Sequence, residues 1–308
     1  MIETKGLTKN YGNLAALVDL DLKINDGDIF GFIGPNGAGK TTTMRILATL
    51  LEPTRGQAFI EGLDVTKNGK KVRSVIGYMP DFMGVYDDLK AFEYLEFFAA
   101  AFGIERKKRK SIVEGVLELT DLRSKLNVSV DSLSRGMQQR LGVARVLIHD
   151  PKVLILDEPA SGLDPRARIE IRELLRELKR MGKTIMISSH ILSELEEICD
   201  RVGIIEHGRL VFSGTMEEIR QRMGVQSKVR VRVGGARERA VELLSGLPQI
   251  QEVKVTGAYI AVTFQDEQNT EGLIARTLVH GDIDIVSIEP EQVKLDDAFL
   301  RLTKGIVH

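Results

Sequence analysis

The stretch from Gly34 to Thr42 constrains the fold of this chain more than any other. It reads Gly-Pro-Asn-Gly-Ala-Gly-Lys-Thr-Thr, comes after the apolar run 29–33 and precedes the apolar residues of 44–47. That order predicts a strand, a glycine loop and a helix, which is the setting of a phosphate-binding P-loop. Glycines let successive backbone N–H groups turn toward phosphate oxygens, and the positive end of the following helix strengthens the field. The stretch therefore predicts a nucleoside triphosphate site.

Each residue of this loop is a candidate nucleotide contact. The candidates are Gly34, Pro35, Asn36, Gly37, Ala38, Gly39, Lys40, Thr41 and Thr42. Lys40 is expected to reach the β- and γ-phosphates, and the Thr41 hydroxyl to ligate Mg²⁺. The alternative is a strand-to-helix turn that is merely rich in glycine, but a turn does not require a lysine and a hydroxyl at these offsets.

A second candidate motif begins with four apolar residues, 153–156, which predict a strand buried on both faces of a parallel sheet. Asp157 and Glu158 come directly after it. In open α/β sheets, ligands bind at the carboxyl ends of the strands. We expect one of these carboxylates to hold Mg²⁺ and its neighbour to polarise a water, although two ordinary loop acids remain the alternative.

Composition narrows the class of protein. A chain of 308 residues has room for about two domains. It carries 43 basic and 44 acidic side chains, so charge gives no reason to expect nucleic acid as a partner. The single cysteine, Cys199, excludes an internal disulfide and fits a reducing cytoplasm. We see no signal peptide and no run of 18 apolar residues, so a membrane role would come through a partner.

The pattern along the chain predicts an α/β protein in two domains, 1–223 and 224–308. Antiparallel strands are expected in 1–28, and a helical subdomain at about 88–150 with helices at 91–104, 111–119 and 140–149. Further helices are expected at 165–181 and 192–199. Beyond residue 224 the order strand, helix, strand, strand, helix, strand indicates a small α+β, ferredoxin-like domain, and after it a helix at 295–302.

Aromatic residues are concentrated in the first of the subdomain helices. Helical spacing places four apolar side chains on one buried stripe: Phe92, Leu95, Ala99 and Phe102. Three aromatics lie off that stripe: Tyr94, Phe97 and Phe98. These three either form an exposed docking surface or are buried, and spacing does not decide between the two.

Together these motifs resemble those of the ATP-binding subunit of an ABC transporter, over roughly residues 2–220. The matching elements are the Walker A loop (34–42), the Walker B strand (153–158), the ABC signature (133–140), the D-loop (161–164), the switch histidine His190 and the adenine-stacking aromatic Tyr11. Walker A alone occurs in many NTPases, whereas the signature just upstream of Walker B is specific to this family. Without the resemblance, Ser134 and Asp164 would be taken as simple helix N-caps.

The resemblance implies a fold and a mechanism. The fold is an α/β P-loop cassette with an antiparallel β subdomain and a helical subdomain. Two cassettes meet head to tail around two ATP molecules, so Ser134 and Gly136 act on the partner's nucleotide, beside Asp164 of the D-loop. Lys40 holds phosphate and Asp157 supports the Mg²⁺. Glu158 is the general base, and His190 contacts the γ-phosphate.

The resemblance also implies a place in the cell. The chain is expected to hydrolyse ATP as a homodimer on the cytoplasmic face of the membrane, bound to an integral membrane permease, with no nucleic acid. The ending 295–300 looks like that of the drug, polysaccharide and lipid export branch. Two other readings are a soluble ABC ATPase of translation or DNA repair and a slow-turnover ATP sensor. We find no second Walker A and no sustained heptads, and Glu158 argues against the sensor.

Two departures from the family pattern matter, one at a single residue and one in the signature. Asp81 stands where the family usually has a glutamine that contacts Mg²⁺ and the attacking water. Arg135-Gly136-Met137 replaces the usual Gly-Gly-Gln of the signature. Ser134 and Gly136 do the phosphate work and are retained, so little loss of function is expected from the second departure.

The first departure gives a testable expectation. A carboxylate at 81 can ligate Mg²⁺ but adds negative charge beside the γ-phosphate. We expect Asp81→Gln to retain ATP binding and to alter the Mg²⁺ dependence of turnover. An unchanged Mg²⁺ titration would count against Asp81 as a ligand.

Overall fold

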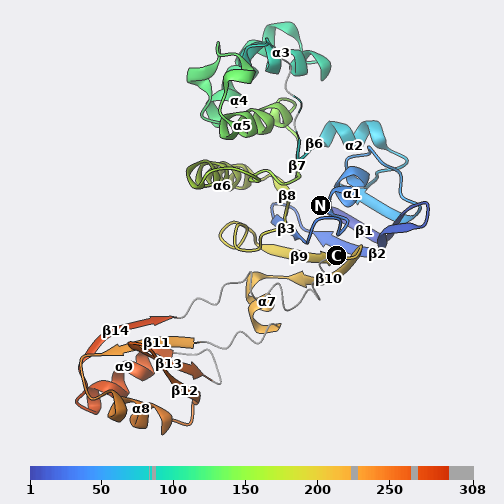
Figure 1. Ribbon diagram of the computed structural model, residues 1–308. Helices are drawn as coiled ribbons and strands as arrows, with labels where there is room; N and C mark the ends of the chain where they lie inside the picture. The colour runs from blue at the N-terminus through green and yellow to red at the C-terminus, as the bar shows by residue number, and fades with distance from the viewer. Residues whose placement is uncertain (83, 85–87, 223–227, 265–269, 291–308) are drawn as a thin grey trace. The chain divides into compact units, whose positions relative to one another are not determined.

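The computed structural model describes residues 1–82, 84, 88–222, 228–264 and 270–290 (Figure 1). The chain forms two compact units, Met1–Met216 and Glu217–His308. The boundary falls within one residue of the start of helix α7 (Met216–Arg222).

The first unit contains two sheets. The smaller runs in the order β2-β1-β4-β5 and is antiparallel, as expected from the alternating pattern of residues 1–28. Its strands are β1 (Ile2–Tyr11), β2 (Leu14–Ile24), β4 (Arg55–Ile60) and β5 (Leu63–Asp64). The larger runs in the order β10-β9-β3-β8-β7-β6. Its strands are β3 (Ile29–Ile33), β6 (Ile76–Met79), β7 (Val153–Leu156), β8 (Thr184–Ser189), β9 (Arg201–Glu206) and β10 (Arg209–Gly214).

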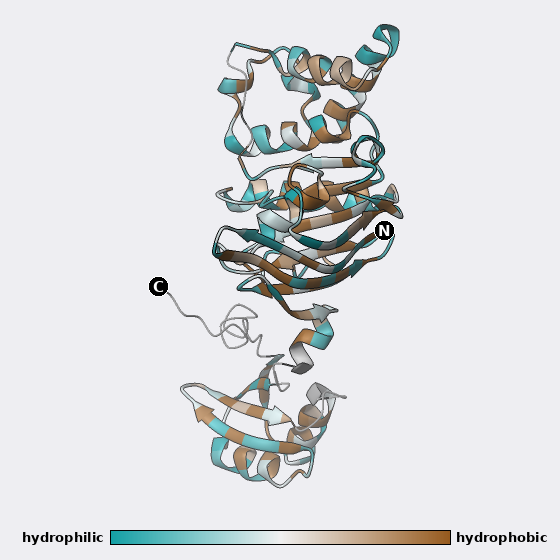
Figure 2. Cartoon of the chain, turned by 90° about the vertical axis from the view of Figure 1, so that its right-hand side faces the viewer, coloured by the Kyte–Doolittle hydropathy of each residue, from teal (hydrophilic) through white to brown (hydrophobic). Residues whose placement is uncertain are grey.

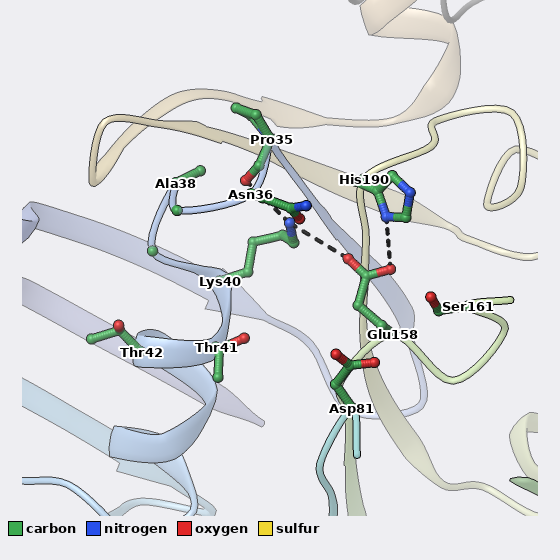
Figure 3. A pocket seen from close by; sticks show the side chains of 12 residues that line it. Pro35, Asn36, Ala38, Lys40, Thr41, Thr42, Asp81, Glu158, Ser161 and His190 are labelled. Carbon is green, nitrogen blue, oxygen red and sulfur yellow. Dashed lines mark hydrogen bonds and ion pairs between the residues drawn. The ribbon is translucent and has the colours of Figure 1, made fainter. Parts of the chain in front are cut away.

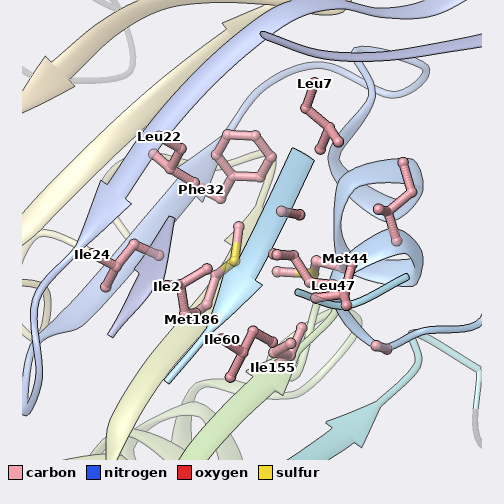
Figure 4. Packing of buried hydrophobic residues seen from close by; sticks show 14 of the residues in the cluster. Ile2, Leu7, Leu22, Ile24, Phe32, Met44, Leu47, Ile60, Ile155 and Met186 are labelled. Atoms are coloured by element: carbon pink, nitrogen blue, oxygen red, sulfur yellow. The ribbon is translucent and has the colours of Figure 1, made fainter. Parts of the chain in front are cut away.

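The middle of the larger sheet is parallel, because β3, β6, β7, β8 and β9 all run the same way, and only β10 is antiparallel to its neighbour. Every residue of β3 and β7 is buried, as the unbroken apolar runs predict. Helices α1 (Lys40–Leu47), α2 (Gly69–Val75) and α6 (Pro165–Arg180) belong to the same unit. The first residue of α1 is Lys40. In Figure 4, Met44 and Leu47 of α1 lie among the buried side chains of both sheets.

Three helices form the predicted helical subdomain: α3 (Ala91–Ala101), α4 (Arg106–Leu119) and α5 (Arg135–Leu147), with 3₁₀ turns at Arg123–Lys125 and Val130–Ser132. Helix α5 begins five residues before the predicted start, because Ser134 caps it by accepting a hydrogen bond from Met137 N at 3.4 Å. The basic run 106–110 forms the first turns of α4, and most of it is exposed.

The aromatic residues of α3 divide differently from the predicted stripe. Leu95 and Ala99 are fully buried as expected. Tyr94, placed off the stripe, is also fully buried, and its ring meets that of Phe98 edge to face at 5.0 Å. Phe102, predicted as core, is exposed and stacks on His149, because the helix ends before it. Of the three off-stripe aromatics, only Phe97 is exposed.

The prediction of a helix at 192–199 is wrong. The segment forms successive turns, with Leu195 N donating to Leu192 O and Ile198 N donating to Leu195 O, both at 3.1 Å. These bonds span three residues, whereas the bond from Cys199 N to Leu195 O has the spacing of a single α-helical turn. Leu192 and Leu195 are both buried, but they lie in turns. The spacing of apolar residues that predicted a helix here therefore reflects burial and not helical structure.

The second unit contains an antiparallel sheet in the order β12-β13-β11-β14. Its strands are β11 (Lys228–Val233), β12 (Ile250–Thr256), β13 (Tyr259–Phe264) and β14 (Ile285–Pro290), and its helices are α8 (Arg237–Ser245) and α9 (Thr270–His280). Strands in this unit alternate between hydrophobic and hydrophilic residues (Figure 2). Val229 and Val231 are buried in the core of the unit while Arg230 and Arg232 are exposed. The strand order is that of a split βαβ fold, and the helix predicted at 295–302 lies outside the described residues.

Burial gives one stability prediction. Phe32 of β3 is fully buried between α1 and the sheets, so Phe32→Ala is expected to cost about 3–5 kcal/mol. The check is the urea midpoint of the first unit, with Leu50→Ala at an exposed position as control, expected within about 0.5 kcal/mol of the parent. A loss below about 1 kcal/mol for Phe32→Ala would show that this core collapses around the gap.

Candidate nucleotide site

The loop 34–39 connects the buried strand β3 to helix α1, as the sequence predicts. Two of its glycines leave no room for a side chain. A Cβ on Gly34 would run into the carbonyl oxygen of Ile205, and one on Gly39, which has φ of 111°, would lie 2.7 Å from Ala16 O. Close packing against β2 and β9 therefore fixes the curvature of the loop.

Lys40 is almost fully buried, with 6% of its surface exposed. Its Nζ donates to Gly34 O at 2.6 Å and to Pro35 O at 3.3 Å, and lies 3.5 Å from Glu158 Oε1. Burial lowers the pKa of Lys40, while the Glu158 carboxylate beside it acts in the opposite direction. The ammonium thus holds its own loop closed.

The two carboxylates that come after β7 have different surroundings. Asp157 is buried, and its Oδ1 accepts a hydrogen bond from Ser188 Oγ at 2.6 Å. The same Oγ accepts a hydrogen bond from Glu158 N at 2.8 Å. Ser188 of β8 therefore orients both residues, a role for which the sequence offered no candidate. The signal available was its place one residue before the end of a strand adjacent to β7.

Asp157 Oδ2 is buried and has no hydrogen-bond partner, which fits a carboxylate that supports a cation shell. Among the described residues, no three His, Cys, Asp or Glu side chains converge as a metal cluster. Mg²⁺ on a nucleotide needs fewer, since it keeps several waters and shares one or two carboxylates with phosphate oxygens. The donor set of Asp157, Thr41 and Asp81 is chemically suitable for Mg²⁺.

Glu158 is the centre of the candidate site. Its backbone is left-handed, with φ of 50°, an unusual conformation for a residue with a side chain. Its Oε2 lies 3.0 Å from His190 Nδ1 (Figure 3). In that view Lys40 and His190 both point toward the Glu158 carboxylate.

These side chains line a cavity of about 250 Å³. Its lining is Pro35, Asn36, Gly37, Ala38, Gly39, Lys40, Thr41, Thr42, Asp81, Glu158, Ser161 and His190. The structure therefore brings the loop together with three distant residues chosen from the sequence, namely Asp81, Glu158 and His190. Ser161 was expected only as the start of the D-loop.

Asp81 lies after β6 at the edge of this cavity. Burial raises the pKa of its carboxyl, the negative charges of Asp157 and Glu158 raise it further, and the positive charge of Arg135 opposes them. The carboxylate is thus held in a region already rich in negative charge.

Ser134, Gly136 and Asp164 lie elsewhere in the unit. They line a second cavity of about 420 Å³, together with Arg140 and Glu170. Asp164 caps α6 by accepting from Ala167 N at 2.9 Å, so it is an N-cap as well as a candidate contact. Arg140 is buried and pairs with Asp121 at 3.0 Å and with Glu170 at 3.4 Å, which fixes α5 against α6.

Tyr11 ends β1 and is 46% exposed. It is not among the residues that line either cavity, and its ring has Lys9 Nζ at 5.4 Å from its centroid. Adenine stacking by Tyr11 stays a prediction.

The buried parallel sheet, the phosphate loop and the carboxylates at the end of β7 define a P-loop nucleoside triphosphatase. The ABC transporter family model matches residues 17–161. The chain is 37% identical to the bacitracin transport ATP-binding protein BcrA of Bacillus licheniformis, over 99% of this chain and 98% of that protein. It is 35% identical to the Nod factor export ATP-binding protein I of Rhizobium sp. (strain N33), over 98% and 96%.

Solved structures agree with these relatives. The ATP-binding subunit of an ABC transporter matches with a TM-score of 0.66 and 31% identity, over 73% of this chain and 94% of that one. A dimeric ATP-binding cassette bound to ADP and phosphate matches with a TM-score of 0.63 and 25% identity, over 70% and 99%. The chain belongs to the ATP-binding proteins of ABC transporters, and it is an ATP-binding, ATP-hydrolysing subunit.

None of the helices in the described part of the chain has the length and apolar character needed to cross a membrane.

Ser188 gives the prediction for this site. Removal of its hydroxyl leaves both Asp157 oxygens without a side-chain partner and frees Glu158 N, so Ser188→Ala is expected to lower turnover by about 10–100-fold. Steady-state phosphate release measures it, with the exposed Ser74→Ala as matched control. Activity within about twofold of the parent would remove Ser188 from the support of the site.

Proposed function

We propose that this ATPase works as a homodimer that holds two ATP molecules between its copies and powers export through a separate membrane-spanning permease. One observation carries the proposal. Within a single chain the phosphate loop lines one cavity, Ser134 and Gly136 line another, and the two linings share no residue. A second copy supplies the missing half of each site.

The second cavity has the chemistry of an anion site. It lies at the start of α5, a helix of 13 residues whose first backbone N–H groups carry partial positive charge. Gly136 stands close to α6, since a Cβ on it would lie 2.8 Å from Ala167 Cβ. We propose that Ser134 and Gly136 receive the γ-phosphate of the partner's ATP, with Asp164 beside them.

Hydrolysis is proposed to take place in the first cavity. Lys40 gives up the carbonyls of Gly34 and Pro35 and binds the β- and γ-phosphates. Glu158 accepts the proton of the attacking water, and His190, hydrogen-bonded to Glu158 in the present arrangement, turns to the γ-phosphate. Bound Mg²⁺ would neutralise charge on the phosphates, held by Thr41, Asp157 and Asp81. Such catalysis is mostly positioning and charge neutralisation.

The direction of transport is proposed from the relatives. Curated relatives that match over nearly the whole chain include a bacitracin transport protein, a linearmycin resistance protein and a Nod factor export protein. We propose export, with the chain on the cytoplasmic face of the membrane through its permease and no nucleic acid partner. Residues 1–223 would form the ATPase and 224–308 a regulatory or assembly domain.

The general base is the direct test. Glu158→Gln preserves the shape of the side chain but cannot accept the proton, so ATP turnover is expected to fall by on the order of 10²–10⁴-fold while ATP binding is retained. Steady-state hydrolysis and nucleotide binding on the same preparation measure both, with Glu238→Gln in the second unit as control. Equal rates for parent and variant would remove Glu158 from the mechanism.

A separate experiment tests for the membrane-spanning partner. When expressed in cells of the species that encodes it, the chain is expected to fractionate with membranes and to copurify with a hydrophobic protein of several spans. Recovery with RNA or DNA, and never with such a protein, would contradict the transporter role.

A further inference from the structure

Asp81 and Arg135, two of the residues that depart from the family pattern, are connected in the structure through the D-loop. Asp81 lies just after β6, and Arg135 is the first residue of α5. Both are charged where the family usually has a neutral residue. From the sequence they are independent, whereas the structure relates them through the D-loop.

Arg135 reaches the D-loop of its own chain. A Cβ placed on Gly162 would lie 2.6 Å from Arg135 Nη2 and closer still to Nη1, so the guanidinium packs directly on the backbone of Gly162. Gly162 has φ of 66°, a conformation that suits glycine. Ser161, its neighbour, lines the nucleotide cavity together with Asp81 and Glu158. The guanidinium therefore contacts the residue next to a residue that lines that cavity.

Arg135 forms no ion pair with any described residue, so its positive charge is not neutralised locally. Across the ranges that the structure describes, no carboxylate lies within ion-pair distance of Arg135, whereas Arg140 of the same helix has two acidic partners. On the other side, the cavity has a surplus of negative charge, with Asp81, Glu158 and the buried Asp157 set against Lys40. An anionic nucleotide entering this cavity meets that surplus.

We propose that Arg135 is a positioning residue that offsets the negative charge of Asp81, so that the cavity accepts a nucleoside triphosphate as if residue 81 were neutral. The proposal rests on the proposed function of the first cavity as the ATP site. It requires that the charge of Arg135 affects nucleotide binding only while residue 81 is charged.

A double-mutant cycle tests this requirement. Arg135→Met keeps most of the aliphatic stem that covers Gly162 and removes the charge. In the parent, we expect it to raise the KM for MgATP about five- to tenfold, the size expected for coupled charges near one site. In the Asp81→Gln background the same change is expected to alter KM less than about twofold. Arg135→Lys keeps the charge and is expected to retain most of the affinity.

The dependence of KM on salt concentration is a second test of the proposal. The KM difference between Arg135→Met and the parent is expected to shrink at about 0.5 M NaCl, because screening weakens partly exposed charges. A structural role on Gly162 would give the same loss in both backgrounds and no salt dependence. Equal rises in KM with Asp81 and with Asp81→Gln would therefore overturn the proposal.

Two controls separate the role of Arg135 from the function of the ATP site. The unfolding midpoints of the parent, Arg135→Met, Asp81→Gln and the double variant show whether a variant has lost structure. Arg135→Lys supplies a folded comparison that keeps the charge. Glu158→Gln in each background reports on the ATP site itself. Turnover that survives Glu158→Gln would contradict the proposed function, whereas an additive cycle with Glu158-dependent turnover would overturn only the role of Arg135.

Discussion

The parallel register of β3, β8 and β7 is the constraint on which the site depends. Ile33 pairs with Ser189, and Leu156 pairs with Ile187, so all three strands end at the same edge of the sheet. The segments after these strands are therefore brought together: the phosphate loop after β3, the carboxylates after β7 and His190 after β8. Every residue of β3 and β7 is buried, so packing in the hydrophobic core holds the strand ends that carry the site.

The side chains at that edge hold one another in place. Lys40 bonds to carbonyls of its own loop, and Glu158 lies between Lys40 and His190. Ser188 holds the carboxylate pair from the neighbouring strand. The left-handed conformation of Glu158 is consistent with a residue kept in an uncommon geometry for its function.

Much of this could be predicted from the sequence, because it depends on local patterns. The loop 34–42, the buried strand 153–156 and the caps Ser134 and Asp164 are each specified by a few neighbouring residues. The failures have a common cause. Residues 192–199 have helical spacing but form turns, and Tyr94 is buried because the three helices α3, α4 and α5 enclose it. Ser188 and the contact of Arg135 with Gly162 depend on pairs far apart in the chain, which no local pattern specifies.

The central claim is that each chain carries two halves of different ATP sites, so ATP should join two copies only when both halves are intact. Light scattering of Glu158→Gln with and without MgATP measures this most directly, since the variant is expected to hold ATP without hydrolysing it. We predict a dimer with MgATP, and a monomer that still binds ATP when Ser134→Arg is added to block the second cavity. A dimer that persists with Ser134→Arg, or a Glu158→Gln protein that stays monomeric at saturating MgATP, would contradict the account.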